Sequence, residues 1–320
     1  MRIAAVTVNW NQARLTQECV SSLAAGTEVP AWIIVVDNGS QTDPTALVRD
    51  VHAPTIVVRN DRNLGFAAGA NIGIERAAAL GAEAVLIVNN DAVVAADCLK
   101  ELSAALEHDV RLGAVGGKTL TREQPPRIHT AYGVLTYHGP LVTQQGWMEA
   151  DTTRFSEFAE VDYVSGCAML LRRTALDAIG LLDADFFAYH EDLDWCIRAR
   201  RGGYHIAYVP TAIVYHRMHG STGGGYLSPI TYLSARNAIL FVRKNATWAE
   251  CLEYALRLPV NLVKEAVFRY RRGELEGFKL RLRGVRDGLL GRPVPLHDLG
   301  LDGQSPVRHC DGAETTAEGW

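Results

Sequence analysis

The densest group of ionisable side chains is the segment His190-Glu191-Asp192-Leu193-Asp194-Trp195, at the predicted start of a helix. It places three carboxylates within four positions. Carboxylates stabilise a helix N-terminus, which explains one or two of them without any chemistry. A carboxylate held near a metal-bound diphosphate can also act as a general base on an acceptor hydroxyl. The residues alone leave both interpretations open.

Two other polar groups follow predicted strands. Asn89-Asn90-Asp91 ends a strand at 84–88 and offers the oxygen ligands that Mg²⁺ or Mn²⁺ prefers, although only Asp91 is anionic. Asp37 closes a strand at 32–36, where it could accept hydrogen bonds from a ribose or from the imide N–H of a base. An ordinary polar turn explains each group equally well.

A run of small residues at 63–71 opens a predicted helix. Free backbone N–H groups at a helix start can bind a phosphate. The run lacks the Gly-Lys-Ser/Thr ending of a phosphate-binding loop, and no GxGxxG follows the first strand. Further along, His216 ends a predicted strand, and His219 and the segment Ser221-Thr222-Gly223-Gly224-Gly225, which ends in a glycine run, follow it. A lone histidine is more often structural than a ligand, and the glycine run could be the hinge of a lid.

The elements that must position these residues form an α/β pattern. Short β-rich runs alternate with helical segments over the first hundred residues, which is typical of a parallel sheet with right-handed crossovers. Ligands bind such open sheets at the carboxyl ends of the strands. Later segments continue the sheet with antiparallel additions. The strands are expected at 3–10, 32–36, 55–58, 84–88, 161–172 and 204–216, and the helices at 14–25, 66–80, 95–107 and 192–201.

Composition excludes several classes of protein. The chain has 320 residues, 48% of them hydrophobic and 21% charged, which excludes disorder and coiled coil. A net charge of −4 gives no indication of nucleic-acid binding. The six cysteines are scattered, without a CxxC pair, which favours a reducing compartment. No window is long and apolar enough for a signal peptide or a membrane span, so we expect a cytoplasmic protein.

The C-terminal part is helical and basic. Apolar residues recur every three or four positions from Trp248 to Tyr270, interrupted by a possible kink at Pro259. Between residues 243 and 292 there are 12 basic and 6 acidic residues. These helices could touch anionic lipid at the inner face of a membrane, form a homodimer surface or simply present a solvated face. We expect a catalytic domain at 1–227, basic amphipathic helices at 228–297 and a flexible tail at 298–320.

Taken together, the motifs resemble the inverting family 2 glycosyltransferases of GT-A fold, particularly their bacterial rhamnosyltransferase-like branch. The resemblance covers about residues 1–245 and depends on the order and spacing of seven motifs. They are Val8-Asn9-Trp10-Asn11; Val36-Asp37-Asn38-Gly39-Ser40; Asn63-Leu64-Gly65-Phe66 with Asn71; Leu86-Ile87-Val88-Asn89-Asn90-Asp91; Gly166 with Met169-Leu170 and Arg172-Arg173; Phe186-Phe187-Ala188-Tyr189 leading into the acidic segment, with Arg198; and His216 with Arg236-Asn237.

The resemblance implies a Rossmann-like mixed sheet flanked by helices, with a C-terminal helical extension, and it implies roles for individual residues. Asp192 would be the general base, and Glu191 would orient donor or acceptor. Asp91 would be the surviving acid of the family's metal-binding DxD motif, with His216 as a further metal or diphosphate contact; Asn89 replaces the first acid. The residues that would bind the nucleotide-sugar are Asn9, Asp37, Asn63, Gly65, Asn71 and Asn90.

The implied reaction is a single displacement with inversion. A sugar would move from a nucleoside diphosphate, such as dTDP-rhamnose or a UDP-sugar, to a hydroxyl of a saccharide, a lipid-linked saccharide or a small molecule, with Mg²⁺ or Mn²⁺ bound. The main alternative is a catalytically inactive protein that binds nucleotide-sugars. A nucleotidyltransferase or a dehydrogenase is disfavoured, because the triphosphate loop and the GxGxxG are both missing.

Overall fold

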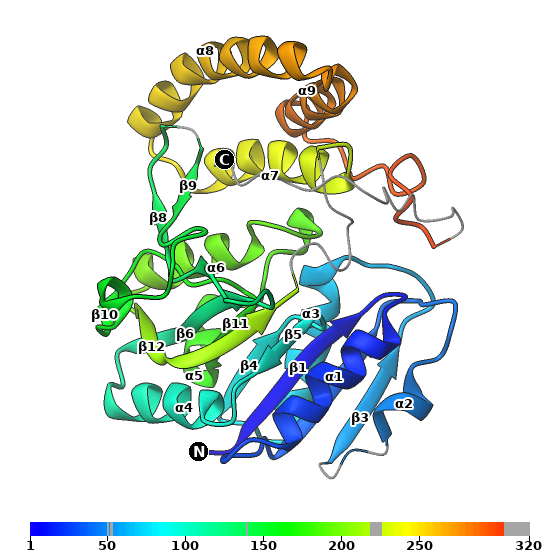
Figure 1. The fold of residues 1–320 in the computed structure, drawn as a ribbon, viewed down its shortest axis with the longest axis vertical. Coiled ribbons are helices and arrows are strands. Elements are labelled where there is room, and N and C mark those ends of the chain that lie inside the picture. Colours follow the sequence, from blue (N-terminus) through cyan, green and yellow to red (C-terminus); the bar gives the residue numbers. More distant parts are fainter. Residues whose placement is uncertain (50, 52–53, 139, 218–225, 304–320) are drawn as a thin grey trace.

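The computed structural model describes residues 1–49, 51, 54–138, 140–217 and 226–303. Figure 1 shows a twisted sheet flanked by helices, with a layer of further helices above it. The strands are β1 (Ile3–Asn9), β2 (Trp32–Asp37), β3 (Thr55–Arg59), β4 (Ala84–Val88), β5 (Ala92–Val94), β6 (Leu112–Thr121), β7 (Ile128–Thr130), β8 (Gly133–Leu135), β9 (Val142–Gln144), β10 (Ala159–Glu160), β11 (Ala168–Arg172) and β12 (His205–His216). The helices are α1 (Ala13–Ala24), α2 (Thr45–Arg49), α3 (Phe66–Ala79), α4 (Cys98–His108), α5 (Arg173–Ile179), α6 (Glu191–Arg201), α7 (Pro229–Asn245), α8 (Trp248–Arg272) and α9 (Leu275–Leu289), with 3-10 turns η1 (Thr153–Phe155) and η2 (Ala184–Phe186).

The main sheet is mixed, in the order β10-β12-β6-β11-β4-β1-β2-β3. Strands β4, β1, β2 and β3 run parallel, and β11 inserts antiparallel between β4 and β6. This arrangement confirms a parallel first half with antiparallel additions. It also brings the carboxyl end of β4 beside the start of β11, since Val88 pairs with Ala168.

Both faces of the sheet are covered, and so its central strands are buried and mostly apolar. Successive side chains of β1 point to opposite faces. Ala4, Val6 and Val8 point into a core shared with α3 and α6. Ile3 and Ala5 point into a second core, shared with α1 and α4. Helix α3 lies unusually close to β1. A Cβ atom at Gly73 would come within 2.2 Å of a methyl group of Val6, so only glycine permits this contact.

The sequence-based boundaries differ from the structure in one important place. A strand was expected over 161–172, but the regular strand β11 covers only Ala168–Arg172. Val161 still bonds to Ile206 of β12, but at Gly166 the chain is off the sheet, since the backbone N–H of Gly166 bonds to a side chain of α6 instead of a neighbouring strand. Pro259, where the sequence indicated a possible kink, lies inside α8, which is a single helix from Trp248 to Arg272.

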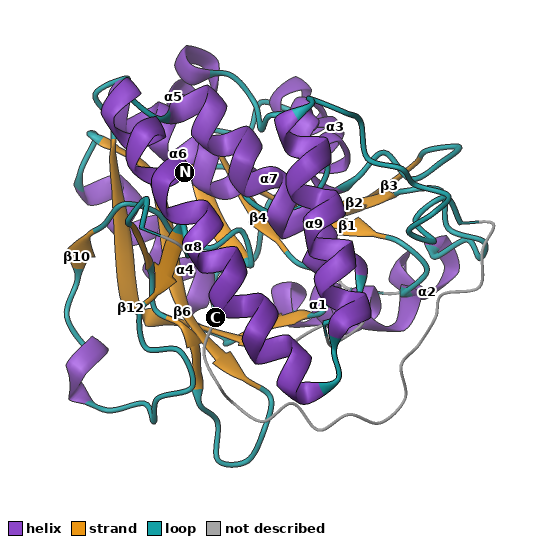
Figure 2. Cartoon of the chain, turned by 90° about the horizontal axis from the view of Figure 1, so that it is seen from above, coloured by secondary structure: helices purple, strands orange, loops and turns teal. Residues whose placement is uncertain are grey.

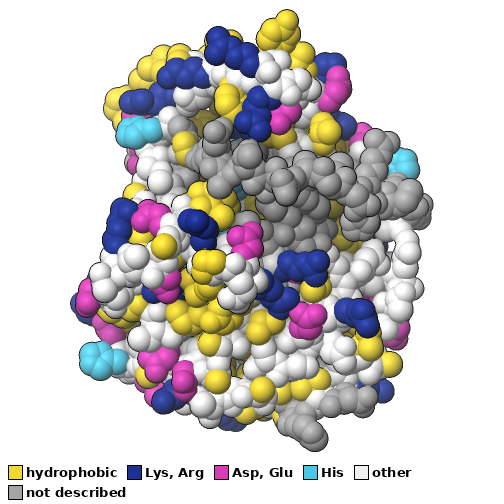
Figure 3. Space-filling model, in the orientation of Figure 1, with side chains coloured by type: hydrophobic (Ala, Val, Ile, Leu, Met, Phe, Trp, Pro, Cys, Tyr) yellow, Lys and Arg dark blue, Asp and Glu magenta, His cyan; other side chains and the backbone are white. Residues whose placement is uncertain are grey.

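The C-terminal helices form a separate layer, with α7 between α8 and the sheet (Figures 1 and 2). Helix α7 is tied to the body, because Phe241 and Val242 belong to the core above the sheet. Apolar and basic side chains appear together at the top of the space-filling view, over α8 (Figure 3). In the part of the chain that the structure describes, no helix is long and apolar enough to cross a membrane.

The boundary predicted for the C-terminal tail, residue 298, comes too early in the chain. Residues 298–303 are described, and Leu301 is buried against Tyr232 and Leu233 of α7. Residues 304–320, like His219 and the segment at 221–225, lie outside the described residues.

Candidate functional site

A buried polar network joins the carboxyl ends of β1 and β2. The side chain of Asn9 donates to Oδ1 of Asp37 across 2.7 Å. Ser40 donates to the same oxygen, and Nε of Arg59 donates to Oδ2 across 2.9 Å. Asp37 is fully buried, and three donors of the chain already bind its carboxylate. Its clearest role in the structure is therefore to hold Asn9 and Arg59 in place; the contact with a nucleoside stays a prediction.

The network continues to the turn after β4 through Thr16 of α1. Its hydroxyl donates to Oδ1 of Asn9 across 2.8 Å and accepts from Nδ2 of Asn90 across 3.2 Å. Asn9, Thr16 and Asn90 are all buried. Because buried polar groups are costly unless they are paired, this chain of bonds fixes the ends of the strands relative to one another.

The small-residue loop before α3 is closed by contacts from three distant segments. Oδ1 of Asn63 accepts from the backbone N–H of Gly65 across 2.9 Å, and Asn38 donates to the carbonyl of Gly65 across 2.8 Å. Gly65 has φ of 86°, and a Cβ atom there would lie 2.5 Å from the ring of Phe187. Nδ2 of Asn63 donates to the carbonyl of Leu301, across 3.0 Å. The end of the described chain thus covers part of this loop.

Asn71 lies within α3, and both ends of its amide bind Leu182. Its Nδ2 donates to the carbonyl of Leu182 across 2.7 Å, and its Oδ1 accepts from the backbone N–H of Leu182 across 3.0 Å. This pair of bonds holds α3 against the segment that leads to α6. The predicted contact between Asn71 and a nucleotide is not part of this arrangement and stays a prediction.

The structure brings Asp91 close to His216, the two residues to which the resemblance assigns the metal; that role stays a prediction. Nε2 of His216 lies 3.0 Å from Oδ1 of Asp91, because β5 pairs with the end of β12. The structure adds His129 of β7, whose Nδ1 lies 3.2 Å from Nδ1 of His216 and whose ring stacks on it. Asp91 is nearly buried, with 4% of its surface exposed.

The residues around Asp91 fit a divalent cation only in part. A carboxylate oxygen and an imidazole nitrogen suit Mn²⁺ or Mg²⁺ when substrate phosphates supply further ligands. Among the residues that the structure describes, no group of three or more His, Cys, Asp or Glu side chains is arranged to hold a metal by itself. A cation at Asp91 would therefore depend on the diphosphate of a bound nucleotide.

Asp192 lies at the same edge of the sheet as Asp91. Its Oδ2 accepts from the backbone N–H of Gly166 across 2.8 Å. The next residue, Cys167, accepts from the backbone N–H of Asn89 across 3.0 Å. Two consecutive residues therefore connect the start of α6 to the turn that carries Asp91. The two acids come from segments about a hundred residues apart and share one side of the molecule.

Burial changes the acid–base properties of this helix start. It raises the pKa of Asp192, an effect that the N–H donors of Gly166 and Leu193 partly offset. The pKa of Glu191 is raised well above its usual range, first by burial and then by the nearby charge of Asp192. Oε2 of Glu191 is buried and has no hydrogen-bond partner among the described residues. Burial lowers the pKa of His190 to about 4, so its ring is neutral at pH 7.

The loop before α6 is held in an unusual backbone conformation. Phe187, Tyr189 and His190 all have positive φ, at 63°, 71° and 75°. Non-glycine residues rarely adopt this conformation, and it persists only where the surroundings hold it. Here Asn237 of α7 provides the restraint: its Nδ2 donates to the carbonyls of Phe186, Ala188 and Tyr189 at 2.7–2.8 Å.

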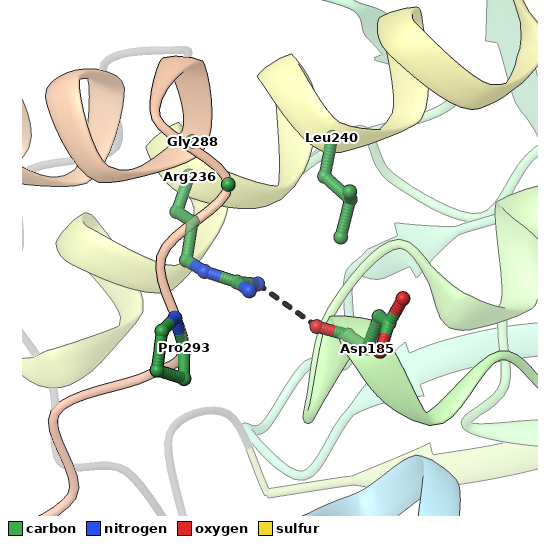
Figure 4. Close-up of a pocket in the computed structure, with 6 residues that line it drawn as sticks. Asp185, Arg236, Leu240, Gly288 and Pro293 are labelled. Carbon is green, nitrogen blue, oxygen red and sulfur yellow. Dashed lines mark hydrogen bonds between the residues drawn. The ribbon is translucent and has the colours of Figure 1, made fainter.

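Arg236, next to Asn237, ties the same loop to the C-terminal layer. Its guanidinium donates to the carbonyl of Asp185 across 2.9 Å and to that of Arg292 across 3.0 Å. Figure 4 shows this side chain crossing a cavity of about 200 Å³ between α7, the end of α9 and η2. The cavity adjoins the loop and contains none of the predicted site residues. Arg236 and Asn237, quoted for the resemblance only, are thus positioning residues for α6.

Sequence reasoning missed three side chains of this region: Thr16, Arg59 and His129. Thr16 lies in an amphipathic helix, where a buried hydroxyl leaves no pattern in the sequence. Arg59 directly follows the apolar residues of β3, as Asp37 does those of β2, and that parallel position was a usable signal. His129 belongs to a three-residue strand, which is too short to show a period.

Several proteins of known or assigned activity are similar to this chain. The N-acetylglucosaminyl-diphospho-decaprenol L-rhamnosyltransferase of Mycobacterium tuberculosis is 27% identical over 300 residues, which cover 85% of this chain and 96% of that protein. The dTDP-rhamnosyl transferase RfbF of Shigella flexneri is 22% identical over 284 residues, covering 82% of this chain and 88% of that protein. Rhamnosyltransferases are therefore among its relatives, as the motifs indicated.

Solved structures agree on the fold. Staphylococcus aureus TarS 1–349 in complex with UDP-GlcNAc has a TM-score of 0.59 and 16% identity, and the match covers 93% of this chain and 84% of that one. The mannosyltransferase PcManGT of Pyrobaculum calidifontis, with GDP-Man and Mn²⁺, has a TM-score of 0.58 and 16% identity, covering 90% and 87%. The expected GT-A fold is confirmed.

A family model agrees with the motifs quoted from the sequence. The model for glycosyltransferase-like family 2 matches residues 1–229, from β1 to the start of α7. This range contains the carboxyl-end network, the Asp91–His216 pair and the start of α6. The chain therefore belongs to the glycosyltransferase-like family 2.

Proposed function

We propose that the protein is an inverting glycosyltransferase that moves a sugar from a nucleoside diphosphate to an acceptor hydroxyl, with Asp192 as the general base. The observation that carries this proposal is the placement of Asp192. Gly166 orients its carboxylate at the sheet edge where the Asn89–Asp91 turn lies. Asp192 can then take a proton from the acceptor while Asp91 helps to bind the diphosphate.

The chemistry follows from these environments. Burial raises the pKa of Asp192, which makes its carboxylate a stronger base than an exposed aspartate while Gly166 keeps it oriented. Glu191, with its pKa raised further, is a neutral acid over a wider range of pH and could donate a hydrogen bond to donor or acceptor. A divalent cation bound at Asp91 and His216 would neutralise the charge that develops on the leaving diphosphate.

The donor is proposed from the relatives. Names of similar proteins include dTDP-rhamnosyl transferase and L-rhamnosyltransferase, and a structure of the same fold contains UDP-GlcNAc. dTDP-rhamnose is therefore the first donor to test, with UDP-sugars second. Small changes in a pocket can redirect a donor, and so the test uses a panel.

The acceptor is proposed as a hydroxyl of a saccharide, a lipid-linked saccharide or a small molecule. A relative in Mycobacterium tuberculosis is named for a lipid-linked acceptor, N-acetylglucosaminyl-diphospho-decaprenol, which gives the lipid-linked class priority. An enzyme with such an acceptor works at a membrane surface, where the lipid part of the acceptor is held. A saccharide without lipid would require no such surface.

The decisive experiment measures nucleoside diphosphate release from the donor panel with each class of acceptor. We expect release with at least one pair, and a product whose anomeric configuration is opposite to that of the donor. Asp192→Asn should lower turnover by about 10²- to 10⁴-fold while nucleotide binding, measured by calorimetry, is unchanged. Asp177→Asn, a change to an exposed acid of α5, is the matched control. Near-normal turnover by Asp192→Asn would exclude the proposed base.

The alternative is a catalytically inactive protein that binds nucleotide-sugars. The orphaned Oε2 of Glu191 and the oriented carboxylate of Asp192 favour the enzyme, because a binding protein has no need for a buried acid pair. Donors that raise the melting temperature without any diphosphate release, across all acceptor classes, would establish the alternative.

The metal is tested separately. We expect Mn²⁺ or Mg²⁺ to be required, and EDTA to abolish turnover. Asp91→Ala should weaken binding of the nucleoside diphosphate when the metal is present, and should have little effect on it without metal. Activity that is indifferent to EDTA would rule out a cation at this site.

A further inference from the structure

Helix α8 exposes an apolar stripe along its whole length. The side chains of Trp248, Leu256 and Val263 are 81%, 67% and 64% exposed, and no residue of α8 is fully buried. At 3.6 residues per turn these residues share one face. The α8 stripe consists of Trp248, Ala249, Leu252, Ala255, Leu256, Pro259, Val260, Val263, Val267 and Tyr270, all of which are exposed.

The stripe is distinct from the face by which α8 is attached to the protein. On its inner side, Tyr254, Leu258 and Leu262 pack against α7 and α9. The helix is therefore apolar on two sides, and only one of them is covered by described residues. Exposed apolar patches of this extent usually mark an interaction surface, because leaving them in water is unfavourable.

A basic border runs beside the stripe. Arg257, Lys264 and Arg271 are exposed along one edge, and Lys264 and Arg271 form no ion pair with a described residue. The three acids of α8 are already engaged: Glu250 in the helix cap, Glu253 with Arg257, and Glu265 with Arg281. At Lys264 and Arg271 the border therefore lacks local counter-charges among the described residues.

Much of the basic charge of α9, in contrast, is used within the protein. Lys279 pairs with Glu276, Arg283 with Asp298, and Arg286 with Asp287. These pairs leave the edge of α8 as the basic surface best placed to attract a partner.

We propose that α8 docks on the surface of an anionic lipid bilayer, with its stripe in the interface and its basic border against lipid phosphates. A helix with an apolar face, a basic edge and no span long enough to cross is the form that lies in the plane of a membrane. Trp248 and Tyr270 lie near the two ends of the stripe, and such side chains favour the headgroup region.

Charge decides between a bilayer and a second copy of the chain. The partner must bring negative charge to Lys264 and Arg271. Anionic lipids do so. A second α8 would bring the same cations, since two of its three acids are paired and the third, Glu250, is bound in the helix cap. The inference stands apart from the proposed reaction: a chain that transferred no sugar could still bind a bilayer in this way.

Docking through α8 would also orient the candidate site. In Figure 1, α8 is the outermost helix of the layer that lies above the sheet. Trp10, directly after β1, packs in the same cluster as Leu280 of α9. The carboxyl ends of the strands therefore lie on the side of the sheet that carries the helical layer, and docking would hold them near the lipid surface.

The test is co-sedimentation of the full chain with vesicles of phosphatidylglycerol and phosphatidylcholine, and with vesicles of phosphatidylcholine alone. We expect strong pelleting with the anionic vesicles and little with the neutral ones. Leu256→Glu with Val263→Glu should lower the partition coefficient about a hundredfold or more, because both side chains enter the interface. Both are exposed, so the fold should tolerate the change. Val110→Glu, at a site 76% exposed on the body, is the matched control and should bind normally.

A second pair of variants tests the charge. Lys264→Glu with Arg271→Glu should lower binding to anionic vesicles about tenfold or more and leave neutral vesicles unaffected. Lys100→Glu with Lys279→Glu is the control of equal charge. Quenching by brominated lipid, taken as the difference between wild type and Trp248→Phe, should place Trp248 in the interface.

Three results would overturn the proposal: no pelleting of the wild type, pelleting that the stripe variants leave unchanged, or equal pelleting with neutral vesicles. A wild-type dimer without vesicle binding, which Leu256→Glu with Val263→Glu converts to a monomer, would assign the stripe to self-association instead. Vesicle binding that persists in Asp192→Asn would show that the surface acts independently of the chemistry.

Discussion

Gly166 and Asp192, 26 positions apart in the chain, are joined by a hydrogen bond of 2.8 Å from the backbone N–H of the glycine to Oδ2 of the acid. A Cβ atom at Gly166 would lie 3.4 Å from Cβ and Oδ2 of Asp192, which is ordinary van der Waals contact. The glycine therefore matters here for its N–H group, and alanine can replace it while a residue without an N–H cannot.

Gly166→Pro should move the acid limb of the pH–rate profile to higher pH. The N–H of Gly166 lowers the pKa of Asp192, so removing it lets burial raise that pKa further. A base must be deprotonated, and activity would then be lost at a higher pH as the solution is acidified. Gly166→Ala keeps the donor and is the control. The measurement is kcat/KM against pH, and an unshifted acid limb in Gly166→Pro would refute the role of this bond.

Glu191→Gln should make the free energy of unfolding less sensitive to rising pH. Folding raises the pKa of Glu191 above the ordinary value of 4.5, so the native state holds its proton more tightly than the unfolded chain. The resulting stability is present at low pH and is lost as pH rises from 4.5 through the raised pKa. Urea denaturation at a series of pH values should show a smaller loss in Glu191→Gln than in wild type. Glu276→Gln, a change to an acid 73% exposed, should match wild type.

Asn237→Leu should damage both stability and turnover. The variant leaves the carbonyls of Phe186, Ala188 and Tyr189 without the donor that restrains them. We expect a loss of about 3 kcal/mol or more in the free energy of unfolding, because each of the three carbonyls left unpaired costs about 1–3 kcal/mol.

Relaxation of this loop should also displace α6 and lower turnover, by about tenfold or more. Nucleotide binding should suffer less than turnover, because Asn237 contacts the loop before Asp192. Asn261→Leu removes a single bond to the carbonyl of His138 and serves as the control. Wild-type turnover in Asn237→Leu would show that the loop keeps its conformation without Asn237.

Leu301→Ala should loosen the loop at Asn63. Leu301 is 3% exposed, and its carbonyl accepts from Asn63, which in turn accepts from the N–H of Gly65. Truncating a buried leucine lowers stability by about 2–5 kcal/mol. Here we expect the loss to affect mainly the packing of the last described segment. We expect faster hydrogen exchange at Gly65 and weaker nucleotide binding. Leu290→Ala, at a site 59% exposed, should change neither.

Local patterns were sufficient for the elements that carry the site. The strand at 84–88 was placed at its observed bounds, and those at 32–36, 55–58 and 204–216 within a residue. Central strands buried on both faces are continuous apolar runs that end in polar turns, and a sequence shows both features. Because carboxyl ends of such strands meet at one edge, Asp37 and Asp91 could be assigned to that edge in advance.

Contacts between distant segments could not be read in this way. The bond between Gly166 and Asp192 depends on where the chain leaves the sheet, and the expected strand at 161–172 hid it. Asn237 reaches its carbonyls across about fifty positions. A hydrogen bond between distant residues leaves no periodic or compositional pattern in the sequence, so only the folded chain identifies it.

The amino-acid sequence by itself determined the α/β class, the order of the motifs, the family and the candidate acids, because these depend on local alternation and on residue types at fixed spacing. Tertiary structure decided which of these side chains are exposed and which are held. It bound the carboxylate of Asp37 to three donors and brought His129 against His216. Among the described residues, it covered only one of the two apolar faces of α8. Periodicity shows that a helix face is apolar, but only packing determines whether the protein covers that face or leaves it for a partner.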